Sequence, residues 1–188
     1  MAKPVSPRGL ARERVLSAAL ALFVEHGVHG TSVGMIAERL GVSKAAVYYQ
    51  FSSKEDIVQE VLRPVVENTS RVIKIAEALP TWEAQRAVVI SGLVEMAVGH
   101  RQLTAVFHAD PAIAQVGSPE LRAATDRLRE LLEGPDPDPT SRIAITLFFA
   151  GVGSVAADPQ FADIDDDDLH RALLDLSNRI LQPATNTV

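Results

Sequence analysis

The sequence contains no cysteine, and this absence excludes disulfides, thiolate metal sites, iron–sulfur clusters and a cysteine nucleophile. Aromatic residues make up only 5% of the chain, with one tryptophan and two tyrosines. No uninterrupted apolar run approaches the roughly 20 residues that cross a bilayer, and the first residues lack the apolar segment of a signal peptide. These absences predict a soluble, cytoplasmic protein that is not exported and has no membrane partner.

What the chain does contain is an ordinary globular composition, with 47% hydrophobic and 22% charged residues in a length of 188. The charge is unevenly distributed. Residues 1–55 carry seven basic and four acidic side chains, a net charge of +3, while the whole chain has −6 and the remainder therefore −9. A basic N-terminal third and an acidic remainder predict a small polyanion-binding module joined to a body with another role.

Apolar residues recur at helical spacing along nearly the whole chain, and no stretch alternates as a strand would. A first helix should stop at Gly27, and two short helices should follow, the earlier one capped by Thr31 or Ser32. Pro64 interrupts a long fourth helix and predicts a kink. Further helices are expected over residues 81–99, 101–109, 120–133, 140–157 and 165–181. The predicted fold class is all-α.

The two short helices carry the pattern that points to function. Ala37 is small where two helices must approach, Gly41 supplies a tight turn four positions later, and Val47 anchors the next helix. This spacing is typical of a helix-turn-helix, whose second helix enters the major groove. Both tyrosines lie on that helix and two of the four lysines bracket it, and their polar groups suit phosphate oxygens. Double-stranded DNA is therefore the predicted partner.

The segment TSVGMIAERLGVSKAAVYYQFSSKEDI, residues 31–57, resembles the DNA-binding signature of the TetR family of bacterial transcriptional regulators. The resemblance is close over about residues 10–60 and loose beyond them. Gly34 and Met35 depart from the family pattern, as does Gln50, which can contact adenine and so bears on the operator sequence. By the resemblance, the residues expected to contact DNA are Thr31, Ser32, Ser43, Lys44, Ala45, Ala46, Tyr48, Tyr49, Gln50 and Lys54.

The resemblance implies an N-terminal three-helix helix-turn-helix DNA-binding domain, residues 1–55, and a C-terminal helical ligand-binding and dimerisation domain, residues 56–188. Aromatic, methionine and histidine side chains of the body could line a pocket for an apolar small molecule, although such residues are more often plain core. The candidates are Trp82, Met96, His100, Phe107, His108, Phe148 and Phe149. Neither the histidines nor the acidic run at residues 165–168 has the spacing of a metal site, so no metal or other cofactor is expected.

The last two helices carry leucines alternately four and three apart and a face of small residues. Both features suit helix pairing, and both could equally be internal core. In the family that the resemblance names, these helices form a four-helix bundle across a twofold axis, which favours a homodimer on a palindromic operator. The candidate interface residues are Ala150, Gly151, Ser154, Leu169, Leu173, Leu176 and Ile180.

The implied function is a ligand-responsive transcriptional regulator, in the first instance a repressor that a small, largely apolar effector releases from DNA. Release would follow from displacement of the fourth helix, which begins near Lys54. One alternative is a DNA-binding dimeric regulator without small-molecule input, whose body serves protein interaction. Another is an all-α enzyme with an incidental helical corner. Paired catalytic carboxylates, a local serine–histidine–aspartate arrangement and a nucleotide-binding glycine loop are all missing from the sequence, so an enzyme is not expected.

Overall fold

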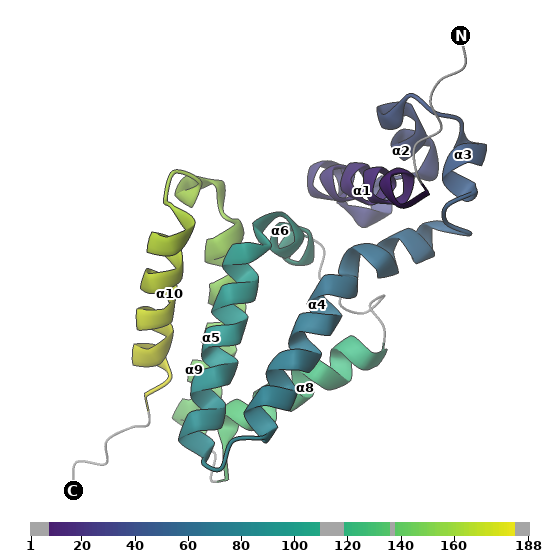
Figure 1. The fold of residues 1–188 in the computed structure, drawn as a ribbon. Helices are drawn as coiled ribbons and strands as arrows, with labels where there is room; N and C mark the ends of the chain where they lie inside the picture. The colour runs from purple at the N-terminus through teal and green to yellow at the C-terminus, as the bar shows by residue number, and fades with distance from the viewer. Residues whose placement is uncertain (1–7, 110–118, 136–137, 183–188) are drawn as a thin grey trace, which may run out of the picture.

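The computed structural model describes residues 8–109, 119–135 and 138–182, and every regular element within these ranges is a helix (Figure 1). The N-terminal helices are α1 (Arg8–Gly30), α2 (Val33–Leu40), α3 (Lys44–Tyr48) and α4 (Lys54–Glu77). The others are α5 (Trp82–Gly99), α6 (Arg101–Ala109), α8 (Pro119–Glu133), α9 (Pro139–Ala157), the short 3-10 helix η1 (Pro159–Phe161) and α10 (Asp166–Ile180). The predicted all-α fold class is confirmed.

Glycine and serine set the ends of the first helices. The backbone leaves the helical conformation at Gly27, where φ is 70°, so α1 is broken there and ends one turn later. Ser32 caps α2 by accepting a hydrogen bond from the Met35 N–H at 3.2 Å. Gly41 follows α2 in the left-handed conformation, with φ of 64°, which a residue with a Cβ would adopt only under strain. Local signals therefore fix the geometry of the helix-turn-helix.

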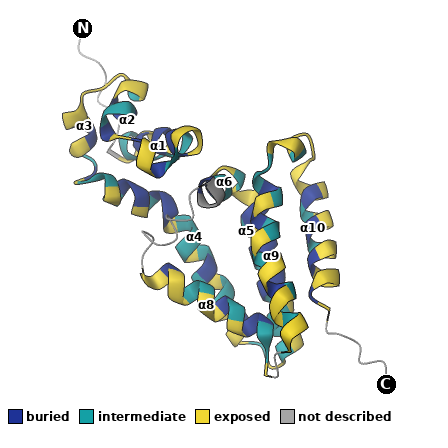
Figure 2. Cartoon of the chain, turned by 180° about the vertical axis from the view of Figure 1, so that it is seen from behind, coloured by how far each residue is buried: buried dark blue, intermediate teal, exposed yellow. Residues whose placement is uncertain are grey.

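α4 joins the two parts of the molecule. Its N-cap is Ser53, and Glu55 and Asp56 place carboxylates in the first turn, where the helix dipole favours them. The helix continues through Pro64 as far as Glu77. Its axis changes direction between the turns beside α1 and the turns beside α5 (Figures 1 and 2). The proline is therefore accommodated within a bent, continuous helix.

α5 is the central helix of the body and contacts α4, α8, α9 and α10. A Cβ added to Gly92 would lie 2.5 Å from a methyl carbon of Val72 on α4, so the glycine permits the close approach of these two helices. The buried residues of α5 belong to an apolar core shared with α8, α9 and α10. They are Val89, Ile90, Leu93, Val94, Ala97 and Val98.

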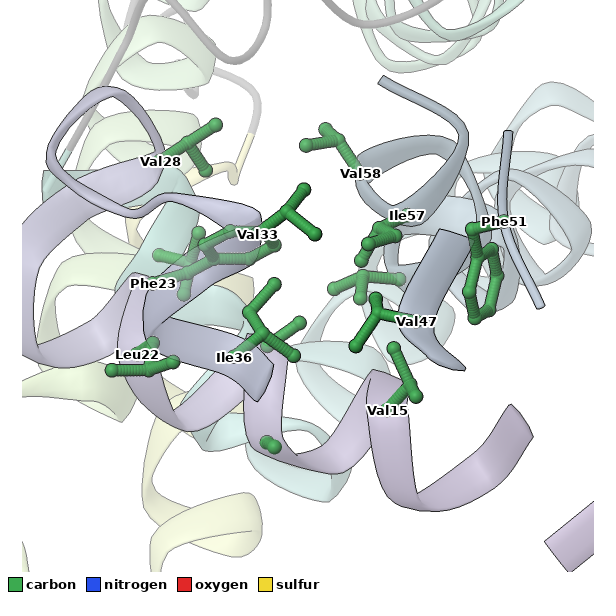
Figure 3. Packing of buried hydrophobic residues seen from close by; sticks show 14 of the residues in the cluster. Val15, Leu22, Phe23, Val28, Val33, Ile36, Val47, Phe51, Ile57 and Val58 are labelled. Carbon is green, nitrogen blue, oxygen red and sulfur yellow. The ribbon is translucent and has the colours of Figure 1, made fainter. Parts of the chain in front are cut away.

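The apolar core of the N-terminal part extends beyond α1, α2 and α3. Ile36 and Val47, the buried anchors of the helix-turn-helix, belong to the cluster shown in Figure 3. The same cluster includes Val61 of α4 together with Leu103 and Val106 of α6. Position 55, where the sequence suggested a domain boundary, therefore lies within the span of this core. The helix-turn-helix rests on two helices that also belong to the body.

α9 is the one helix in the described part of the chain that is long and apolar enough, by length and composition alone, to cross a membrane. It has 19 residues and a mean hydropathy of 1.4, and 22% of that stretch is buried. Within the fold it packs against α5, α6, α8 and α10. Its composition follows from having two apolar faces, one in the core and one at the surface.

Candidate nucleic-acid interface and ligand cavity

α3 presents the predicted DNA-reading side chains to solvent. Val47 is 1% exposed and holds the helix against the core, whereas Tyr48 and Tyr49 are 51% and 69% exposed. Their neighbours Lys44, Ala45 and Ala46 are exposed, and Gln50 is half-buried. The anchor fixes the orientation of the helix, and the exposed side offers phenol hydroxyls and an ammonium as hydrogen-bond donors.

Three serines cap the helices around this surface. Ser32, Ser43 and Ser53 each accept a hydrogen bond from the backbone N–H three residues ahead, at 3.2, 3.2 and 3.0 Å. Helix N-termini carry unpaired N–H groups and a partial positive charge, which favours phosphate oxygens at the starts of α2 and α4. Ser32 and Ser43 are exposed, and Lys54 is half-buried in the first turn of α4.

Thr31 does not lie on that surface, and the structure corrects the prediction that it contacts DNA. The side chain is 2% exposed, and its hydroxyl lies within hydrogen-bonding distance of the carbonyl oxygens of Leu22, at 3.1 Å, and Gly27, at 2.8 Å. The hydroxyl therefore bonds within the N-terminal domain, beside the break in α1 at Gly27. Sequence alone could not show which of two adjacent hydroxyl residues faces inward.

Lys44 lies across the start of α2. A Cβ added to Gly34 would be 2.8 Å from Cε and 3.2 Å from Nζ of Lys44, and 3.4 Å from Oγ of Ser32. The missing side chain at Gly34 thus makes room for the lysine, whose ammonium adds to the positive end of α2. Neither Lys44 nor Lys54 takes part in an ion pair within the described ranges, so both ammoniums are available to phosphate.

Arg12 of α1 contacts the end of the DNA-reading segment, residues 44–50. It was not among the residues predicted from the sequence. Its Nη1 donates to the carbonyl oxygen of Gln50 at 2.9 Å, and its guanidinium carbon lies 4.2 Å from the centre of the Phe51 ring. Its Nη2 is 3.2 Å from Oε1 of Glu60 on α4. The hydrogen-bond partners are 38 positions apart in the chain, so no local pattern could have indicated the contact.

A second arginine is also paired within the N-terminal domain, at its surface. Arg39 donates to both carboxylate oxygens of Glu25, at 2.7 and 2.6 Å. This hydrogen bonding lowers the pKa of Glu25 below its usual value and raises the pKa of Arg39. Arg12 and Arg39 therefore each face a carboxylate, whereas Lys44 and Lys54 do not within the described ranges.

A cavity of about 310 Å³ lies in the body between α4, α5, α8 and α9, with one residue from α6. Its threonine hydroxyls are used by the protein: Thr104 donates to the Ala97 carbonyl at 3.3 Å, and Thr125 donates to the Leu121 carbonyl at 2.9 Å. The wall is therefore largely apolar, with Arg122 and His100 as its strongly polar side chains. The lining residues are Val65, Thr69, Leu93, Met96, Ala97, His100, Thr104, Leu121, Arg122, Thr125, Leu128, Phe149, Val152 and Gly153.

The structure brings together three of the predicted pocket residues, Met96, His100 and Phe149. Trp82 lies at the other end of α5, where its indole N–H donates to the Leu131 carbonyl at 3.0 Å. Phe148 is 3% exposed and belongs to the core. Neither side chain lines this cavity, so the structure does not bring Trp82 and Phe148 together with the other three.

The two remaining pocket candidates, Phe107 and His108, fall in α6, but their side chains lie outside the described residues. No group of three or more His, Asp or Glu side chains that could hold a metal ion occurs in the described ranges.

A surface of apolar and small residues runs along α9 and α10, where Figure 2 shows exposed turns of the two helices. Ile143 and Leu147 are 62% and 59% exposed, and Leu176 and Ile180 are 50% and 47% exposed. We define the α9/α10 face by its exposed members Ile143, Leu147, Ala150, Ser154, Ala172, Leu176 and Ile180. Ile143 and Leu147 were not among the predicted interface residues, although their spacing with Ala150 and Ser154 forms one helical stripe.

Two leucines predicted for the dimer interface point into the core of the body instead. Leu169 and Leu173 are 3% and 6% exposed and pack in the core of the body. They are therefore unavailable to a partner, and only the Leu176 and Ile180 end of the predicted seam reaches the surface. Gly151 is half-buried beside the face. The leucine spacing alone could not distinguish the two sides of α10.

Comparison with known proteins gives a match for residues 15–61 to the family of bacterial regulatory proteins, tetR family. The HTH-type transcriptional activator FasR of Mycolicibacterium smegmatis is 38% identical over 80 residues, 43% of this chain and 36% of the relative. The ketosteroid transcriptional regulator KstR2 of Mycobacterium tuberculosis superposes with a TM-score of 0.70 at 19% identity, covering 96% of each chain. FadR of Bacillus subtilis, solved in complex with stearoyl-CoA, gives a TM-score of 0.56 at 20% identity, covering 90% of this chain and 95% of that one.

The fold and the exposed α3 define a helix-turn-helix protein with an all-helical body. Residues 15–61, which span most of α1, then α2, α3 and the first turns of α4, are similar to the tetR family of bacterial regulatory proteins. The sequence match of the chain to FasR spans about a third of that relative's length, 36%, and the likeness of the body to solved regulators is one of fold. What the body binds must therefore be argued from the residues of this chain.

Proposed function

We propose that the protein regulates transcription by binding an operator through α3. The observation that carries this proposal is the exposed row Lys44, Tyr48 and Tyr49 on a helix anchored by the buried Val47. Lys44, Lys54 and the capped starts of α2 and α4 would position the phosphate backbone, while Ala45, Ala46 and Gln50 would face the base edges. Such a regulator acts on the chromosome, in the cytoplasm of a bacterial cell.

The operator-binding form is proposed to be a homodimer. The α9/α10 face combines four large apolar side chains, each about half exposed, with small residues that allow close helix packing. An isologous pairing of this face across a twofold axis would bury it and join two reading helices in one particle. Two reading helices roughly 34 Å apart would enter successive major grooves and require a palindromic operator.

The cavity is proposed to bind a small, largely apolar effector with an anionic end. Its wall is apolar because the threonine hydroxyls are already bonded, and Arg122 and His100 supply the polar groups. An apolar body would gain from leaving water, and a carboxylate or phosphate would gain from the guanidinium. The stearoyl-CoA recorded with FadR has both an acyl chain and phosphates, and it supports this class for a protein of the same fold.

Effector binding is proposed to release DNA by shifting α4. Val65 and Thr69 of α4 line the cavity, and the same helix begins at Lys54 beside the reading helix. An effector that binds more tightly when α4 is displaced would lower DNA affinity, and DNA would lower effector affinity by the same factor. The simplest consequence is repression that the effector relieves.

The DNA-binding proposal is tested by selecting duplexes from a random pool with the purified full chain and footprinting the selected duplexes. We expect an inverted repeat whose binding is weakened about tenfold or more in a Lys44→Ala, Tyr48→Phe double variant. Lys74→Ala is the matched control, because Lys74 is an exposed lysine near the other end of α4. Failure to enrich any sequence over the starting pool would contradict the proposal.

The effector proposal is tested by measuring release from the selected duplex with saturated fatty acids of increasing length and with the matching alcohols. We expect the carboxylates to release DNA better, and Arg122→Gln to remove that advantage. Arg127→Gln, on the same helix but outside the cavity lining, should keep it. If none of the fatty acids or alcohols changes DNA binding, the result would favour a regulator whose body serves only protein interaction.

A further inference from the structure

Arg12 touches both the DNA-reading segment and α4. We infer that Arg12 is a positioning residue, which ties the end of the reading segment to α4 and carries a displacement of α4 to the DNA-binding surface. This inference rests on the proposed function, because it names the link between the reading surface and the helix that would be displaced. Arg12 itself is not proposed to contact DNA.

The contact at the reading segment is made through the backbone. Nη1 of Arg12 donates to the carbonyl oxygen of Gln50 at 2.9 Å, at the end of the segment that starts with Lys44. The N–H groups of Gln50 and Phe51 both donate to the Val47 carbonyl, at 2.9 and 3.1 Å, so the chain turns sharply here. A charge-assisted hydrogen bond to the outward carbonyl fixes this turn. The fixed turn then orients Tyr49 and Gln50.

The contact at α4 is an ion pair on the second turn of that helix. Nη2 of Arg12 lies 3.2 Å from Oε1 of Glu60, and Arg63 approaches the other carboxylate oxygen at 3.3 Å. Glu60 and Pro64 also line an open hollow of about 500 Å³ between α1, α4 and the α5–α6 turn. This part of α4 therefore has room to move, and Glu60 would move with it.

Arginine is suited to this link because one planar group makes all three contacts. The guanidinium stacks 4.2 Å from the centre of the Phe51 ring while its two terminal nitrogens reach Gln50 and Glu60. A lysine ammonium is a point charge and could not satisfy the same set. Since the guanidinium is rigid, a shift of Glu60 must either turn it away from the Gln50 carbonyl or move that carbonyl.

The test is a double-mutant cycle between Arg12 and Glu60, read as affinity for the selected duplex over a salt series. We expect Arg12→Gln and Arg12→Lys each to weaken binding about tenfold, the scale of one charged hydrogen bond. Glu60→Gln should weaken it less, and the double variant should equal Arg12→Gln alone. The salt dependence should stay unchanged, because every phosphate contact is kept.

Two matched controls separate the link from plain charge removal. Arg14→Gln removes an exposed charge two positions along α1, and Arg63→Gln removes the other partner of Glu60 without touching the reading segment. Both should bind nearly as the unmodified chain does. Additive effects of Arg12 and Glu60, full activity of Arg12→Lys, or a weaker salt dependence in Arg12→Gln would overturn the inference.

Failure of the proposed function would be recognised separately, as absence of any selected duplex for the unmodified chain. In that case amide hydrogen exchange in the free protein still tests whether Arg12 fixes the turn at the end of the reading segment. We expect the Gln50 and Phe51 amides to exchange faster in Arg12→Gln than in Arg14→Gln, at equal thermal stability. Equal exchange in the two variants would overturn the inference.

Discussion

The DNA-reading end of this protein, α1 to α3, and its helical body have opposite kinds of surface. At the reading end, polar side chains such as Tyr48 and Lys44 stand exposed on short, capped helices over an apolar core. In the body, apolar side chains are exposed along the α9/α10 face and form most of the wall of the cavity between α4, α5, α8 and α9. Recognition of a polyanion needs displayed donors, whereas self-association and effector binding need apolar surface that can be removed from water.

The largest effect is expected from charged side chains on the α9/α10 face, because they would replace the exposed apolar surface of the body. Leu147→Glu with Leu176→Glu should prevent dimerisation, because four carboxylates would have to be buried across the twofold axis. Without the second reading helix, operator binding should weaken by at least about 100-fold, since the paired site acts at high effective concentration. Light scattering and duplex titration measure the two effects. Ile75→Glu, equally exposed but outside the face, is the control.

At the reading end, the next largest effect is expected from Lys44→Ala with Tyr48→Phe. Removal of phosphate donors should weaken operator binding about tenfold or more and lower the salt slope by about 1 for each phosphate that is no longer neutralised. In a dimer each donor is removed twice. Duplex titration from low to high salt measures the slope. An unchanged slope would mean that these side chains do not touch phosphate.

Filling the cavity should separate its role from that of the reading end. Ala97→Leu adds apolar volume to the wall of the 310 Å³ cavity and should weaken effector binding about tenfold, as added methylenes do in a fitted pocket. DNA affinity without effector should stay the same. Isothermal titration with the best fatty acid measures the change. Ala87→Leu, on an exposed position of α5, should leave both affinities intact.

Thr31→Val distinguishes structural support from DNA contact within the N-terminal domain. The variant leaves the Leu22 and Gly27 carbonyls without the hydroxyl donor and should cost about 1–3 kcal/mol in the free energy of unfolding. Operator affinity measured well below the melting temperature should not change, because Thr31 is buried. Reduced affinity with unchanged stability would restore Thr31 as a DNA contact.

The smallest effect is expected at the surface pair of Glu25 and Arg39. The pKa of Glu25 is lowered by its hydrogen bonds from Arg39, so its contribution to stability is present above about pH 4.3, the usual glutamate value, and is lost as the pH falls through the folded-state pKa. The melting temperatures of the unmodified chain and Arg39→Gln should differ slightly at neutral pH and converge at an acidic pH below the folded-state pKa of Glu25. A difference that persists at that pH would contradict the ion-pair explanation.

The reading end could be predicted well from the sequence because its determinants are local. Gly27, Ser32 and Gly41 fix helix ends within a few residues, and the buried Val47 follows from helical spacing. What escaped prediction depends on contacts across the chain. Arg12 meets Gln50 from another helix, and Thr31 turns inward to the Gly27 carbonyl at the break in α1 while Ser32 stays exposed.

The body was predicted in outline but not in its surfaces. Helical spacing identified α8, α9 and α10, yet it could not show which stripe of α10 meets α5. Leu173 therefore proved to be core, while Leu176 is exposed. In the same way, composition could not place Trp82 and Met96 at opposite parts of α5. Which apolar residue is enclosed and which is displayed is set by packing between distant segments.

The proposal that two joined copies of α3 read one operator is tested by changing the spacing of the half-sites. Affinity and complex mass are measured for the selected inverted repeat and for versions with 5 or 10 inserted base pairs. We predict two chains on the original duplex and no tight binding with about 5 inserted base pairs, because half a helical turn places the second groove on the far side. Equal affinity at all spacings would contradict a rigid dimer reading successive grooves.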